Sequence, residues 1–298
     1  ATVTDLPGFS KAYKLEVTTA QSSYSGTTIS VPIETVLEGQ DIAHLNFGTS
    51  NAKNIIISFY VKSSVTGNFA CAVFNGNSID RVNVKDFTIN SANTWEYKTI
   101  SFVGDTGGTW RTDGTQGLYV ALASAGSGDS AVTTAGTWQG GGYKNRTSSS
   151  ANLFATNGAT IQFTGLQLEV GPQATAFEHR SFAEELKLCQ RYFHSVINQG
   201  WLTAGNNGSY LALGVYLGGS KMAGYWYHPV PMRANPTLVQ GTATNGWNIY
   251  RANGGDQFND LGSIITNSAA LHGKEFTLTE VSSCLLYTSP SPRDVEES

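Results

Sequence analysis

Charged side chains are scarce in this chain. Asp, Glu, Lys and Arg make up 13% of its 298 residues, against roughly a quarter in ordinary soluble proteins. Only 18 residues are Lys or Arg, they are scattered along the sequence, and the net charge is −4. Because a nucleic-acid-binding surface needs clustered basic side chains, we expect no nucleic-acid partner.

Long apolar runs and cysteines are also few. No run approaches the about 20 apolar residues of a membrane-spanning helix, so we expect no membrane insertion. One of the three cysteines lies in the terminal stretch set aside below. The other two, Cys71 and Cys189, are predicted to be buried thiols and not a disulfide or a metal site.

Catalytic motifs are missing as well. The sequence contains no G-x-S-x-G turn, no H-E-x-x-H helix and no phosphate-binding glycine loop. The five histidines show no metal-ligand spacing. A glycosidase needs two carboxylates across a cleft, and nothing singles out a pair among several acids (Asp41, Asp80, Asp86, Asp105 and Glu169). We therefore expect a non-catalytic protein.

Short alternating segments separated by Gly, Ser, Thr and Asn fill the first half of the chain. In residues 55–61 the apolar side chains point one way, and Ser58, Tyr60 and Lys62 point the other way. Residues 69–74, 95–103, 118–122 and 161–170 are further strand candidates. This pattern predicts an all-β fold, an antiparallel β-sandwich. The Gly- and Ser-rich segment 124–159 is long for a loop, and we expect a strand near 137–143.

The stretch 161–193 contains a strand, a corner and a helix. Apolar residues occupy odd positions up to Phe163 and even positions from Leu166, which predicts a β-bulge at Gly165. Ser181 with Glu184 is a capping-box signature. Four apolar residues then follow at helical spacing, so we expect a short linking helix whose apolar face is packed. These residues are Phe182, Leu186, Cys189 and Phe193.

The same stretch carries a resemblance to a known family. The run LQLEVG, then AT-x-FEHR and L-x-LCQRYF resembles a block found in bacteriophage tail-fibre and related virion proteins. There it joins a jelly roll like that of carbohydrate-binding modules to a C-terminal β domain. ISFYVKSSVTG, NTWEYKTISFVGDTGGTW and PVPMRANPTL resemble that family more loosely. The resemblance implies a jelly roll over residues 1–178, and a short helix with a second small β module over 179–283. It also implies a virion location, a homotrimer and a host cell-surface glycan as partner.

The last residues, 284–298, are set aside from the fold. CLLYTSPSPRD resembles a sequencing adapter translated in frame, and the composition changes abruptly there. The chain also begins with Ala1 and not Met. We therefore expect the sequence to be a fragment.

Aromatic residues in Gly- and Asn-rich contexts are the candidate sugar-binding residues, because a flat apolar ring with a polar tip suits a pyranose face. For any one of them, burial in ordinary packing is the alternative. Trp95, at a strand start, is predicted to lie in the core. The candidates are Trp110 with Arg111, Trp138 with Tyr143, Tyr225 with Trp226, and Trp247 with Tyr250.

No cofactor is expected, apart from a structural calcium ion for which Glu34, Glu38 and Asp41 would supply oxygen ligands. Solvated loop acids are the simpler interpretation of these three residues. The leading hypothesis is a phage tail-fibre-type protein that binds host-surface carbohydrate without hydrolysing it. One alternative is the carbohydrate-binding accessory module of a glycoside hydrolase whose catalytic domain lies outside the sequence. Another is a purely structural fibre connector with its aromatic residues buried.

Overall fold

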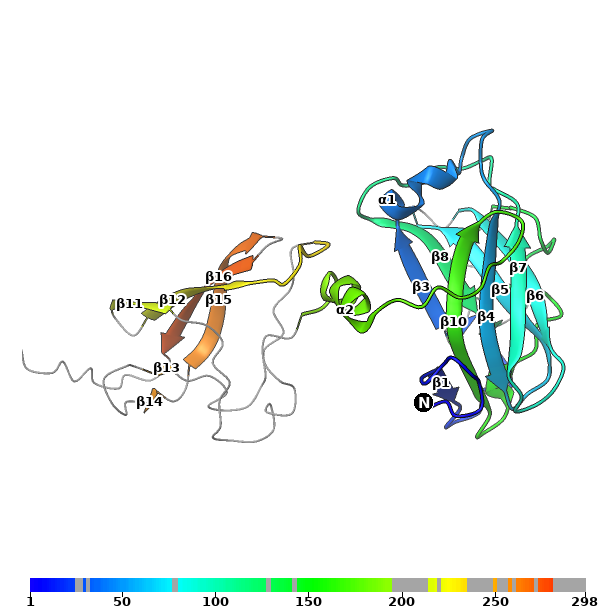
Figure 1. Ribbon diagram of the computed structural model, residues 1–298, viewed down its shortest axis with the longest axis horizontal. Coiled ribbons are helices and arrows are strands. Elements are labelled where there is room, and N and C mark those ends of the chain that lie inside the picture. Colours follow the sequence, from blue (N-terminus) through cyan, green and yellow to red (C-terminus); the bar gives the residue numbers. More distant parts are fainter. Residues whose placement is uncertain are drawn as a thin grey trace, which may run out of the picture. The chain divides into compact units, whose positions relative to one another are not determined.

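The computed structural model divides into two compact units, residues 1–179 and 180–298, each of which is described by itself (Figure 1). In the first unit the structure describes residues 1–24, 29–30, 33–76, 80–126, 130–140 and 144–179. In the second it describes residues 180–194, 214–218, 221–234, 249–250, 257–258, 261–270 and 273–280. The stretch 284–298 lies outside these ranges.

The first unit is a β-sandwich of two four-stranded antiparallel sheets, with strand orders β1-β10-β4-β7 and β3-β8-β5-β6. Successive strands mostly change sheet, so the order is that of a jelly roll, and the predicted fold class is confirmed. The first sheet contains β1 (Tyr13–Glu16), β10 (Thr160–Val170), β4 (Ile55–Ser63) and β7 (Glu96–Phe102). The second contains β3 (Ile33–Glu38), β8 (Gln116–Leu122), β5 (Gly67–Asn75) and β6 (Val82–Ile89).

Shorter elements connect these strands. β2 (Ile29–Ser30) pairs with β9 (Ala125–Gly126). The helical turns are α1 (Gly39–Ile42), η1 (Ala43–Leu45) and η3 (Leu153–Ala155). In the segment 124–159, Gln139 forms an isolated antiparallel bridge with Val82 of β6 where a strand was expected near 137–143, and residues 141–143 lie outside the described part.

The core lies between the two sheets, as the alternating pattern predicts. The inward-facing side chains of β4, among them Ile57 and Phe59, are fully buried against the other sheet. Cys71 on β5 is buried, which confirms the prediction, and burial raises the pKa of its thiol well above the usual value. A second apolar cluster lies on the outer face of the β3-β8-β5-β6 sheet, where Phe74 stacks on Tyr119 and Val132 belongs to the same cluster.

The predicted bulge is present in β10. The pairing of β10 with β4 shifts register between Thr164 and Gln167, and Gly165 adopts a φ of +61°. The ring of Phe9 lies directly over this glycine, because an added Cβ would be 2.8 Å from the Cζ atom of Phe9. The bulge therefore requires glycine for its backbone angle and for the close approach of this ring.

Beyond the bulge, four residues hold the returning chain against β10, and we call them the linker clasp: Gln167, Glu169, Thr175 and Glu178. The Gln167 side chain accepts a hydrogen bond from the Glu178 N–H at 2.8 Å. Glu169 accepts bonds from the Thr175 N–H and hydroxyl at 3.0 and 2.5 Å. The clasp gives a structural reason for the polar residues of the LQLEVG and AT-x-FEHR runs.

Helix α2 (Phe182–Gln190) begins with the predicted capping box between Ser181 and Glu184. The prediction that its apolar face is packed is wrong, because the helix buries none of its residues and the side chain of Phe182 is 81% exposed. Cys189 is likewise exposed and not buried. Helical spacing identifies an apolar face, but it cannot show whether another element covers that face.

The second unit contains the small β module that the sequence predicts. Its antiparallel sheet has the order β11-β12-β16-β15, and a two-stranded pair joins β13 to β14. In the described part of the chain, no helix has the length and apolar character needed to cross a membrane. The strands are β11 (Gly214–Gly218), β12 (Lys221–Tyr227), β13 (Ile249–Tyr250), β14 (Gln257–Phe258), β15 (Leu261–Ala270) and β16 (Gly273–Glu280).

Candidate functional site

Two of the predicted aromatic sites come together at the edge of the sandwich. Trp110 and Trp138 lie edge to face, with ring centroids 5.6 Å apart and an interplanar angle of 89°. Both rings also contact Phe47, at centroid distances of 4.7 and 5.9 Å. Each indole is half-buried and packs against the main core. The loops 103–115 and 130–140 thus form one aromatic cluster.

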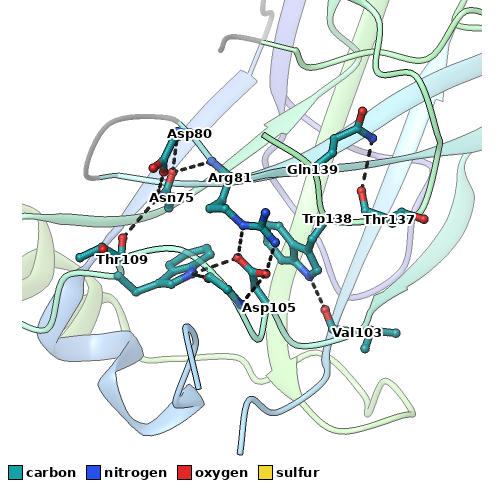
Figure 2. A network of polar contacts seen from close by, with 11 residues as sticks. Asn75, Asp80, Arg81, Val103, Asp105, Thr109, Thr137, Trp138 and Gln139 are labelled. Carbon is teal, nitrogen blue, oxygen red and sulfur yellow. Dashed lines mark hydrogen bonds and ion pairs between the residues drawn. The ribbon is translucent and has the colours of Figure 1, made fainter. Parts of the chain in front are cut away.

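An ion pair lies beside this cluster (Figure 2). The Arg81 guanidinium donates to both carboxylate oxygens of Asp105, at 2.8 Å from Nε and 2.5 Å from Nη2. Asp105 is 1% exposed and also accepts bonds from the Trp110 indole and the Gly107 N–H, both at 3.2 Å. The hydrogen bond to Asp105 raises the pKa of Arg81 above its ordinary value. Asp105 therefore fixes the position of Trp110 while its own charge is neutralised.

Asn75 holds the turn that presents Arg81. Its side-chain oxygen accepts the backbone N–H groups of Asp80 and Arg81, both at 3.1 Å. Its amide nitrogen donates to the Asp80 carboxylate at 2.6 Å and to the Thr109 carbonyl at 3.2 Å, as Figure 2 shows. Asn75 is completely buried, and these bonds use both ends of its amide. It joins the end of β5 to the loop that carries Trp110.

The glycines of the GDTGGTW sequence permit this close packing. Gly108 has a φ of +75°, and an added Cβ would lie 2.4 Å from the Cγ atom of Arg81. A side chain at this position would displace the Arg81 stem and disturb the ion pair with Asp105. The sequence pattern thus reflects a backbone approach around the salt bridge and not a phosphate-binding loop.

The indole N–H groups of Trp110 and Trp138 already donate hydrogen bonds to acceptors within the protein. Trp138 donates to the Val103 carbonyl at 2.6 Å, and Trp110 donates to Asp105 and to the Gly107 carbonyl. The predicted partner Arg111 is half-buried and donates to the Thr115 hydroxyl at 3.0 Å. The cluster can therefore offer a ligand ring surface, but its two indole donors are engaged.

The candidate calcium ligands do not form a metal site in the described residues. No group of three or more His, Cys, Asp or Glu side chains that could hold a metal ion occurs there. Glu38 is buried and accepts a bond from the Gln40 amide at 2.9 Å, whereas Glu34 and Asp41 are exposed. Glu34 and Glu38 lie four residues apart along β3, and Asp41 lies in α1.

In the second unit, two tyrosines share one face of β12. The rings of Tyr225 and Tyr227 are 4.7 Å apart at an angle of 68°, and the residues are 39% and 77% exposed. Gly273 lies directly opposite Tyr227 on β16, so the residue paired with Tyr227 has no side chain. Trp226 lies in β12 and Tyr250 in β13. The side chains of these two residues, and the whole of Trp247 and Tyr143, lie outside the description.

Several residues were not among the sequence candidates. Trp95 is not in the core: it is half-buried on the outer side of its sheet and donates its indole N–H to Asp5 at 2.9 Å. Tyr60 and Tyr97 also face outward, and alternation along β4 and β7 was a sufficient signal for both. Asn75, Arg81 and Asp105 could not be found in this way, because their contacts join distant parts of the sequence.

Comparisons with known proteins add no information on identity. No protein-family description, no curated protein and no solved structure matches this chain. The resemblance to phage tail-fibre proteins therefore stays a prediction from sequence.

Proposed function

We propose that this chain belongs to a phage tail-fibre-type virion protein and binds host cell-surface carbohydrate without hydrolysing it. The observation that carries the proposal is the pairing of Trp110 and Trp138. Two loops contribute one indole each to a cluster that is held by a buried ion pair and stays partly exposed. Rigidly placed aromatic rings suit the apolar faces of sugars.

The tyrosine pair on β12 supports the same proposal independently. Two adjacent exposed rings on a sheet face, set at 68° to each other and with a glycine opposite one of them, offer apolar ring surface together with phenol hydroxyls. A homotrimer on the virion, as the family resemblance implies, would present several copies of each surface and raise avidity.

The structural connector is the second candidate, and one observation favours it. Both indole N–H groups of the cluster bond to protein acceptors and both rings pack on the core, as purely structural tryptophans do. The accessory-module alternative has no comparable observation in its favour.

The test is a tryptophan-fluorescence titration of the whole chain against purified bacterial surface polysaccharides. We expect a saturable change that is lost in Trp138→Ala. Val103→Ala is the matched control, because it trims a neighbouring exposed side chain and leaves the carbonyl that accepts the Trp138 bond. A folded protein that responds to no polysaccharide would support the structural connector instead.

A further inference from the structure

A patch on the outer face of the β1-β10-β4-β7 sheet has aromatic residues where a solvent-facing sheet usually carries polar ones. Tyr60 on β4 lies directly opposite Tyr97 on β7, with ring centroids 4.9 Å apart. Tyr97 is 45% exposed. Trp95 lies two residues before Tyr97, and the Lys62 ammonium is 5.8 Å from the centre of its ring. We call these four residues the tyrosine patch.

Contacts within the protein account for the aromatic residues around Phe9, at one end of this surface, but not for Tyr97 at the other end. Phe9 lies 5.3 Å from Tyr60, and its ring also contacts Phe177 and His179 at 5.4 and 5.2 Å. These contacts anchor the N-terminal segment and the linker beside the bulge. Tyr97 extends the row of rings away from them, at the edge strand of the sheet. Within the described residues, neither Tyr60 nor Tyr97 makes a hydrogen bond through its hydroxyl.

The charges around the patch are paired with one another. Lys62 contacts Asp5 at 2.6 Å, and Asp5 also accepts the Trp95 indole N–H. Glu96 and Lys98 flank Tyr97 in β7, but they lie opposite Val61 and Phe59 of β4 and so alternate to the other face of the sheet, where they contact each other at 2.6 Å. A strongly charged partner would have to break the pair of Lys62 with Asp5. A purely apolar partner would leave the tyrosine hydroxyls without bonds.

The surface therefore offers two neighbouring ring faces, free phenol hydroxyls and no net charge. A neutral oligosaccharide combines apolar C–H faces with hydroxyls that both donate and accept, so it matches each of these features. We propose that the tyrosine patch is a separate binding surface for neutral oligosaccharide chains, with neighbouring sugar units on Tyr97 and Tyr60. This inference rests on the proposed function but uses none of the residues of the Trp110–Trp138 cluster.

Tryptophan side-chain NMR separates the two surfaces in one experiment. The chain contains six tryptophans, and their indole N–H signals are assigned by single Trp→Phe variants of the full-length protein labelled with nitrogen-15. The probes are cellohexaose, maltohexaose and chitohexaose, with a hexamer of galacturonic acid as the charged comparison. We expect a neutral probe to shift the Trp95 signal saturably and the charged probe to leave it unchanged.

Variants then locate the binding. Tyr97→Ala is expected to weaken the affinity read from the Trp95 signal roughly tenfold, and Tyr97→Phe, which keeps the ring, to weaken it less. Tyr13→Ala is the matched control, since Tyr13 is another exposed tyrosine of the same sheet, 52% exposed, on the other edge strand. Its affinity is expected to equal that of the wild type.

Three results would overturn the inference. If the Trp110 and Trp138 signals move while that of Trp95 does not, the patch does not bind sugar, although the proposed function stands. If no tryptophan signal responds to any neutral probe, the patch does not bind neutral oligosaccharides, and the proposed function is judged by the titration with bacterial polysaccharides. If the Trp95 signal shifts with protein concentration in the absence of sugar, the patch is a contact between copies of the chain instead.

Discussion

Replacing Gly165 by alanine tests the account of the β-bulge. Any L-residue there must adopt the left-handed conformation, at a cost of about 1–2 kcal/mol. In addition, the new Cβ would lie 2.8 Å from Cζ and 3.0 Å from Cε1 of Phe9. The Phe9 ring must therefore move away from Tyr60, Phe177 and His179. Weakening such aromatic contacts adds about 1–2 kcal/mol, so we expect a total loss of roughly 2–4 kcal/mol.

Gly158→Ala is the matched control for backbone strain. Gly158 has a similar φ of +75°, but an added Cβ would meet nothing within 4 Å. Its expected loss is only the about 1–2 kcal/mol of left-handed strain. Both variants are compared by urea denaturation of the full chain, followed by circular dichroism.

The Phe9→Ala background isolates the steric part. Once the ring is removed, Gly165→Ala should cost no more than Gly158→Ala, and the coupling in this double-mutant cycle measures the clash. Equal losses for Gly165→Ala and Gly158→Ala in the wild-type background would refute the reasoning. So would a cycle without coupling.

Two further predictions concern carboxylates. Although burial raises the pKa of Glu96, hydrogen bonds from Lys98, Ser91 and Asn90 lower it to about 2. Because the pKa is lowered on folding, ionised Glu96 stabilises the fold at pH values above its ordinary pKa of about 4.5, and this stabilisation is lost as the pH falls toward 2. Urea midpoints should therefore decline between these two pH values. The decline should be less steep in Glu96→Gln. Asp105→Asn leaves Arg81 without its counter-charge and should lower the free energy of unfolding, measured by urea denaturation, by about 3 kcal/mol. Asp5→Asn, at a more exposed ion pair, should lower it much less. Similar losses in the two variants would contradict the structural role of Asp105.

Local patterns in the sequence were enough to predict the local features of the hinge. The phase change from Phe163 to Leu166 located the bulge, and Ser181 with Glu184 located the start of α2. Each feature leaves its signal in residues close together in the chain, where periodicity and spacing carry the information. Exposure of the helix could not be predicted, because it depends on what the rest of the chain places nearby.

The candidate site shows the same limit. Trp110 and Trp138 were each selected by their local context, but their pairing depends on Gln139 bonding to Val82 and on Asp105 reaching Arg81. Asn75 has no sequence signature at all, although it holds the turn before Arg81. Such long-range contacts come from strand order, which the alternating pattern leaves undetermined.

Three acidic residues of the first unit share a structural role. Asp86 accepts the hydroxyls of Thr147, Ser149 and Ser150, Asp105 holds the loop of Trp110, and Glu169 closes the linker clasp. Hydrogen bonds from the Thr175 and Gln167 side chains lower the pKa of Glu169, whereas a glycosidase acid needs a raised pKa. These three carboxylates anchor loops, so under the proposed function the recognition of a partner would fall to aromatic rings and hydroxyls.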